Sequence, residues 1–91
     1  MSGNQVVEHM IVRTLKPLFD TKGLVLLKLA ERPMSRSELA RELGVSYSSI
    51  DYALLRLIKE GLVSERGSIF YLTEEGKKLL RMATDYIKSL K

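Results

Sequence analysis

Apolar residues recur three and four positions apart along most of this chain, a spacing that predicts amphipathic helices. Shorter apolar runs after Gly61 have the length and composition of strands. The predicted helices cover about residues 4–18, 21–31, 35–43, 46–60 and 74–90, and the predicted strands about residues 62–66 and 69–72. We therefore expect a single, mainly α-helical domain over residues 1–91, with one small β-hairpin.

The run from Leu24 to Ala30 is open to two interpretations. Its apolar residues fit a six-residue strand, but Asp20 or Thr21 can cap a helix before it, and Pro33 closes the segment. These flanking signals favour a helix. Because that helix is apolar on nearly every side, we expect it to be central to the core or to a dimer.

Local signals separate two short helices in the middle of the chain. Ser35 and Glu38 have the spacing of a capping box, in which each side chain bonds the other residue's backbone amide. Gly44 can adopt the left-handed conformation that ends a helix, and Ser46 can cap the next one. The buried stripe expected for the second helix consists of Ile50, Ala53, Leu54, Leu57 and Ile58. Two helices joined by so short a turn predict a helix-turn-helix.

A hairpin and a long helix follow. Gly67 and Ser68 form a two-residue turn signal between the strand-like runs. Thr73 can cap the last helix, which has acidic residues in its first turn where the helix dipole favours them. Its apolar stripe consists of Leu79, Leu80, Ala83, Tyr86, Ile87 and Leu90.

Composition restricts the possible functions. The chain has no cysteine and a single histidine, His9, so cysteine-based metal sites, disulfides and thiol catalysis are excluded. We expect no metal, no cofactor and no enzymatic activity, since no Gly-rich phosphate loop or carboxylate cluster is present either. No apolar run is long enough to span a membrane, and we expect a cytoplasmic protein. Scarce Asn and Gln beside abundant Lys, Arg and Glu fit a heat-adapted source.

The net charge of +4 favours an acidic partner, but the excess is unevenly placed. Residues 35–60, which hold the helix-turn-helix, carry equal numbers of cations and anions. The positive excess lies in residues 21–34 and 73–91. Charge alone therefore does not identify a nucleic-acid partner.

Residues 35–76 resemble winged-helix repressors of the MarR-like, ArsR-like and PadR-like families. Four sequence words carry the resemblance in the correct order: residues 37–40 (SELA), 44–46 (GVS), 57–63 (LIKEGLV) and 72–76 (LTEEG). Residues 15–33 are similar to the first core helix of the ArsR-like group. The hairpin is shorter than usual and the metal-sensing cysteines are absent. The chain is most similar to stand-alone winged helices of archaea and their viruses.

The resemblance implies a sequence-specific transcription regulator, and a homodimeric repressor in particular, that inserts helix 46–60 into the major groove of double-stranded DNA. The outward-facing residues of that helix, the start of the preceding helix and the wing provide the expected contacts. The predicted DNA-binding residues are Arg36, Ser46, Tyr47, Ser48, Ser49, Tyr52, Arg56, Arg66 and Ser68. Asp51 lies on the same face, where it could accept a hydrogen bond from a cytosine amino group or orient Arg56.

Two further questions stay open at this point. Residues 4–19 and 74–90 carry full apolar stripes, which indicates either a homodimer interface or two helices that fold back to complete a monomeric core. The neutral helix-turn-helix and the short wing are also compatible with a protein–protein interaction module or with a non-specific architectural DNA binder.

Overall fold

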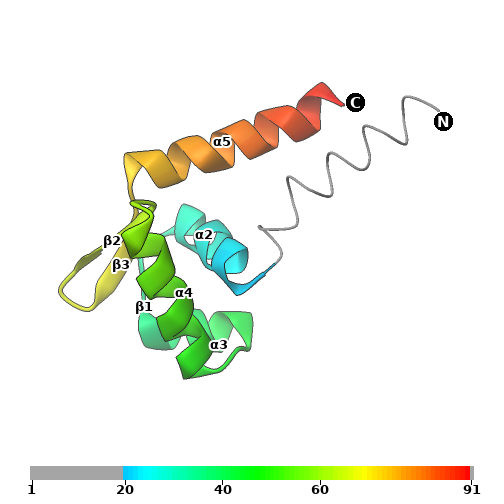
Figure 1. The fold of residues 1–91 in the computed structure, drawn as a ribbon. Helices are drawn as coiled ribbons and strands as arrows, with labels where there is room; N and C mark the ends of the chain where they lie inside the picture. The colour runs from blue at the N-terminus through cyan, green and yellow to red at the C-terminus, as the bar shows by residue number, and fades with distance from the viewer. Residues whose placement is uncertain (1–19, 91) are drawn as a thin grey trace.

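The computed structural model describes residues 20–90, and within them the predicted order of elements is confirmed (Figure 1). The elements are α2 (Thr21–Glu31), β1 (Met34–Ser35), α3 (Arg36–Leu43), α4 (Tyr47–Lys59), β2 (Val63–Arg66), β3 (Ile69–Leu72) and α5 (Glu74–Ser89). Apart from β1, which was not predicted, every boundary lies within one residue of its predicted position, which is the usual uncertainty of a helix end. The helix predicted over about residues 4–18 lies outside the described residues.

The helices begin and end where side chains satisfy their terminal backbone groups. Asp20 caps α2 by accepting from the Gly23 amide at 2.9 Å. The capping box of α3 is complete: the Glu38 amide donates to Ser35 Oγ at 3.2 Å, and the Ser35 amide donates to Glu38 Oε1 at 3.1 Å. Gly44 ends α3 with φ of 66°, a left-handed conformation that favours glycine. These local bonds explain why the boundaries follow from the sequence.

The sheet has three antiparallel strands in the order β1-β3-β2, one more than the predicted hairpin. The wing strands pair Val63 with Leu72 and Arg66 with Ile69, and Gly67 takes a positive φ at the turn. The additional strand, β1, has only two residues and pairs Met34 with Phe70. Its strand conformation depends on pairing with a distant segment, so no local pattern predicts it.

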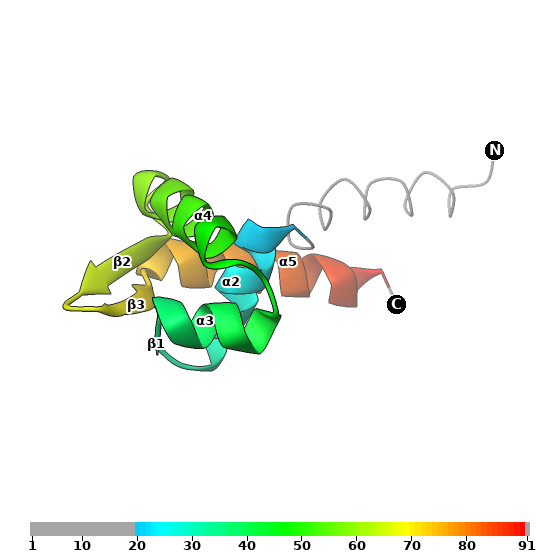
Figure 2. The same cartoon turned by 90° about the horizontal axis from the view of Figure 1, so that it is seen from below.

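The core lies where α2, α3, α4 and the sheet meet (Figures 1 and 2). Its fully or nearly buried side chains are Val25, Leu26, Leu29, Met34, Leu39, Ile50, Ala53, Leu54, Leu57, Val63, Phe70 and Leu72. The helical interpretation of residues 21–31 is confirmed, and three residues of α2 occupy the centre of the core. Leu27, by contrast, is exposed.

The buried stripe predicted for α4 is wrong at one position. Ile50, Ala53, Leu54 and Leu57 are buried, but Ile58 is 40% exposed. Ile58 lies in the last turn of α4, beyond the four residues that pack into the core, and its side chain is left partly open.

Helix α5 crosses the domain above α2 and continues beyond it (Figure 1). Its N-terminus is attached closely: the Thr73 amide donates to the Leu62 carbonyl at 3.1 Å, and Thr73 Oγ1 donates to the Gly61 carbonyl at 2.7 Å. Gly76 is buried against the same segment, and a Cβ there would overlap the Leu62 carbonyl oxygen. The end of α4 and the start of α5 are thereby held together.

Farther along α5 the apolar stripe is only partly covered. Ala83 is buried and Leu80 packs against the core, whereas Leu79 and Ile87 of the stripe are 39% and 38% exposed, and Met82 beside the stripe is 60% exposed. Within residues 20–90, α5 therefore does not complete the core with its whole stripe. None of the helices between residues 20 and 90 combines the length and the apolar character needed to cross a membrane.

Candidate nucleic-acid interface

The outer face of α4 is accessible and, apart from Leu55 and Ile58, polar. Every residue expected to face outward from this segment is exposed: Ser46, Tyr47, Ser48, Ser49, Asp51, Tyr52, Leu55, Arg56 and Lys59. Tyr52 and Leu55 are the most open of the large apolar and aromatic side chains, at 62% and 63% exposed. The opposite face supplies four core residues, so the orientation of α4 about its own axis is determined by burial.

The first turn of α4 is ordered by its own cap. The Ser49 amide donates to Ser46 Oγ at 3.1 Å, and Ser46 Oγ donates to Ser49 Oγ at 2.8 Å. Ser46 therefore serves first as the helix cap and contributes little free hydrogen-bonding capacity. Ser48 and Ser49 lie at the exposed start of the helix, where short side chains allow another molecule to approach the backbone amides.

One flank of α4 contacts α3 and the sheet. Arg36 Nε lies 2.6 Å from Asp51 Oδ1, and the Arg36 guanidinium stacks over the Phe70 ring at 5.5 Å from its centroid. Tyr47 Oη and Ser37 Oγ are 3.4 Å apart. Arg36, one of the predicted DNA-binding residues, is thus also engaged within the protein, and its partner Asp51 lies on the exposed face of α4.

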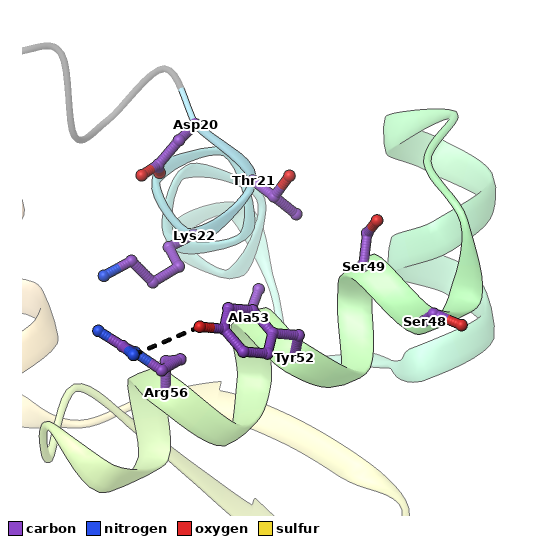
Figure 3. Close-up of a pocket in the computed structure, with 8 residues that line it drawn as sticks. All are labelled: Asp20, Thr21, Lys22, Ser48, Ser49, Tyr52, Ala53 and Arg56. Atoms are coloured by element: carbon purple, nitrogen blue, oxygen red, sulfur yellow. Dashed lines mark hydrogen bonds between the residues drawn. The ribbon is translucent and has the colours of Figure 1, made fainter.

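The other flank of α4 borders α2 across an open groove of about 520 Å³ (Figure 3). Arg56 donates to Tyr52 Oη at 3.4 Å and lies over that ring, with its guanidinium carbon 5.8 Å from the centroid. Lys22 extends from the first turn of α2 toward the same end of the groove, and its ammonium also contacts Glu60 at 3.4 Å. The groove therefore brings two cations together beside the exposed face of α4.

Lys22, which lines the groove beside Arg56, was not among the DNA-binding residues predicted from the sequence. Its place beside Arg56 results from the packing of α2 on α4, which no local pattern of the sequence reveals. The general positive excess of residues 21–34 was the only available signal.

The two predicted residues of the wing, Ser68 and Arg66, lie in different places. Ser68 lies with Arg36 and Tyr47 around a small notch of about 270 Å³ between the hairpin tip and the starts of α3 and α4. Arg66 lies over the Tyr71 ring at 5.9 Å and lines a different groove, with Arg32 and Lys77. The structure therefore groups Ser68 with the outer face of α4 and separates Arg66 from it.

An ion pair joins Arg32 to the first turn of α3. Arg32 Nη1 donates to Glu38 Oε2 at 2.8 Å, and Glu38 also accepts from the Ser35 amide. The hydrogen bond from Arg32, followed by that from the Ser35 backbone, holds the pKa of Glu38 below its ordinary value. Reciprocally, the bond to Glu38 raises the pKa of Arg32.

The helix-turn-helix also matches a known protein family. A family model described as bacterial regulatory protein, arsR family, matches residues 20–65, which include the helix-turn-helix and all of β2 except its last residue. No curated protein shows significant similarity to the chain.

Several solved structures share the fold. The YusO protein from Bacillus subtilis superposes with a TM-score of 0.78 at 18% identity, over 94% of this chain and 68% of that one. Sco5413, a MarR family transcriptional regulator from Streptomyces coelicolor, gives 0.73 at 21% identity, over 96% and 68%. The transcriptional regulator BldR from Sulfolobus solfataricus gives 0.69 at 26% identity, over 90% and 66%. The fold is that of the winged-helix regulators, and the chain spans about two-thirds of their length.

Proposed function

The chain belongs to the ArsR family of bacterial regulatory proteins and is a DNA-binding transcription regulator, and we propose that it acts as a homodimeric repressor that reads double-stranded DNA with α4. The single observation that carries the DNA-reading role of α4 is its exposed, mainly polar face, held in place by a buried stripe on its other side. The family and the fold are those of transcription regulators rather than of enzymes.

In the proposed complex the first turns of α4 enter the major groove. Ser48 and Ser49 allow close approach to a phosphate or a base edge, while Tyr47 and Tyr52 offer an apolar ring for thymine methyls and a phenol for a polar contact. Ser46 caps α4 and so orders the turn that carries Ser48 and Ser49. These assignments are supported by exposure and by placement on one helix face.

Cationic and hydroxyl side chains at the border of α4 would fix its position on the DNA backbone. Arg56 and Lys22 lie on one side of the helix, and Arg36 and Ser68 lie on the other. A phosphate on each side would then be within reach of a separate pair of side chains. Arg66, in its separate groove, would contact only a more distant part of the duplex.

Arg56 provides the direct test of this arrangement. Arg56→Ala should weaken binding to a duplex selected from a random pool by about 1–3 kcal/mol, roughly 5- to 150-fold at fixed salt. Arg56→Lys should retain most of the affinity if the contact is a phosphate, and should lose it if the guanidinium reads guanine. Arg81→Ala on α5 removes the same charge and should cause a smaller loss that is equal on all duplexes. Unchanged affinity for Arg56→Ala would remove Arg56 from the interface.

Homodimerisation through residues 4–19 and 74–90 is supported by the exposed Leu79, Met82 and Ile87 of α5. A two-fold dimer would place two copies of α4 about one DNA turn, ~34 Å, apart. Sedimentation at micromolar concentration should give twice the mass of the 10.3 kDa chain. Met82→Glu should shift the mass toward the monomer, whereas Lys88→Gln, with the same change in net charge, should not. A monomeric mass for the unaltered protein would contradict the dimer.

A second candidate function is binding to protein through the same fold. The electrical neutrality of residues 35–60 and the short β2–β3 turn favour it. Absence of DNA binding at low salt would support this candidate, and equal affinity for all duplexes would instead support an architectural DNA binder.

A further inference from the structure

Asp51 is an anion on the face of α4 that is proposed to approach DNA, where a carboxylate repels phosphates. It follows the first turn of α4, and that turn contains no acidic residue. Favourable interaction with the helix dipole is confined to the first turn and does not account for Asp51. Nor does it orient Arg56, since Arg56 bonds Tyr52 and lies on the groove side of the helix.

The contact that Asp51 does make joins α4 to α3. Its Oδ1 lies 2.6 Å from Arg36 Nε, and both side chains remain about half exposed. An ion pair so accessible to water contributes little to folding stability. Stabilisation of the fold is therefore a weak explanation for a carboxylate at this position.

Arg36 is well suited to hold the carboxylate in one place. Its guanidinium lies over the buried Phe70 ring of β3, and its Nε is itself buried. The Nε–H bond is not directed at a hydrogen-bond acceptor within the described residues, so the contact with Asp51 is one of charge and proximity. The contact places Oδ1 against the guanidinium, and the Asp51 side chain remains 49% exposed.

We infer that Asp51 is a specificity-determining residue that accepts a hydrogen bond from the exocyclic amino group of a cytosine in the major groove, with Arg36 as its positioning residue. The inference rests on the proposed function. Cytosine is the base that suits a carboxylate, because its amino group is a donor without the neighbouring N7 acceptor that adenine presents. Asp51 thus requires a C·G pair at one position of the DNA sequence that each protomer contacts.

Selection from a random duplex pool, followed by titration of the selected duplex, tests the inference. The unaltered protein should select a fixed C·G pair that Asp51→Ala no longer requires, with a loss of about tenfold in discrimination at that pair alone. Affinity of Asp51→Ala for random duplex should rise, because a negative charge leaves the interface. Asp51→Asn should change the preferred base from cytosine toward adenine, to which an amide can bond in two places.

A change of base preference cannot result from misfolding, so the Asp51→Asn variant keeps the test decisive even if Asp51→Ala is less stable. Replacing the selected cytosine by N4-methylcytosine, which removes the donor in the major groove, should weaken binding of the unaltered protein and leave Asp51→Ala unaffected. Arg36→Met should reduce the cytosine preference several-fold without abolishing it.

The outcomes distinguish this inference from the proposed function. If the unaltered protein selects no consensus, both are overturned. If it selects a consensus that the Asp51 variants share, or if those variants change affinity equally on all duplexes, the role of Asp51 is overturned and the proposed function stands.

Discussion

Substitution of Gly76 by alanine tests whether α5 is attached to the domain as described. In a helix, alanine is more favourable than glycine by about 1 kcal/mol, and propensity alone therefore predicts that Gly76→Ala stabilises the protein. The structure predicts the opposite sign. A Cβ at this position would overlap the Leu62 carbonyl oxygen and would lie 3.1 Å from Leu72 Cδ2.

The magnitude follows from what must move. The obstructing atom belongs to the backbone, and it already accepts a hydrogen bond from the Thr73 amide at 3.1 Å. Relieving the overlap displaces α5 and stretches this bond together with the one from Gly76 N to Thr73 Oγ1 at 3.1 Å. Overpacking costs about 1–3 kcal/mol and each weakened hydrogen bond about 0.5–1.5 kcal/mol, which outweighs the gain in propensity. We expect a net destabilisation of about 1–3 kcal/mol.

Thermal denaturation followed by circular dichroism, at one protein concentration, measures this effect. Each kcal/mol should lower Tm by roughly 4–8 °C in a domain of this size. Lys78→Ala is the matched control, because Lys78 is exposed on the same helix, and its effect should stay within about 0.5 kcal/mol. A Gly76→Ala protein as stable as the unaltered one, or more stable, would refute the attachment of α5 through Leu62.

Three other predictions concern the core, the capping box and pH. Leu54→Ala, at a side chain that is 2% exposed, should lower the free energy of unfolding by about 2–5 kcal/mol in urea denaturation. Ser35→Ala removes the cap of α3 and should cost about 1 kcal/mol by the same measurement, so an unchanged urea midpoint would argue against the cap. Since the pKa of Glu38 is lowered in the folded protein, its stabilising contribution is complete above the ordinary glutamate pKa and is lost as pH falls through the lowered value. Glu38→Gln should therefore be less stable than the unaltered protein at pH 7, with a difference that narrows toward pH 3; a constant difference would contradict the assigned cause.

Much of the fold is predictable from the sequence because its boundaries are set by local chemistry. Ser35 and Glu38 bond each other's amides across three residues, and Gly44 adopts a conformation that other residues avoid. Features that depend on distant segments were not predictable. Strand β1 exists because Met34 pairs with Phe70, and no pattern near Met34 indicates this.

The candidate site divides in the same way. The exposed face of α4 follows from helical periodicity, apart from Ile58, because the core residues determine which side remains outward. Helical periodicity does not show which residues of other helices lie beside that face. Arg36 reaches Asp51 from the start of α3, and Lys22 reaches the groove beside Arg56 from α2, through packing that involves three helices.

Whether α4 reads DNA sequence is tested most directly by titrating the selected duplex and a scrambled duplex of equal length across a series of salt concentrations. For both duplexes the logarithm of affinity should fall linearly with the logarithm of salt concentration, as phosphate contacts release counterions. The selected duplex should stay at least about 10³-fold tighter than the scrambled one at physiological salt. Equal affinity for the two duplexes, or no binding to either at low salt, would contradict the assignment of α4 as a sequence-reading helix.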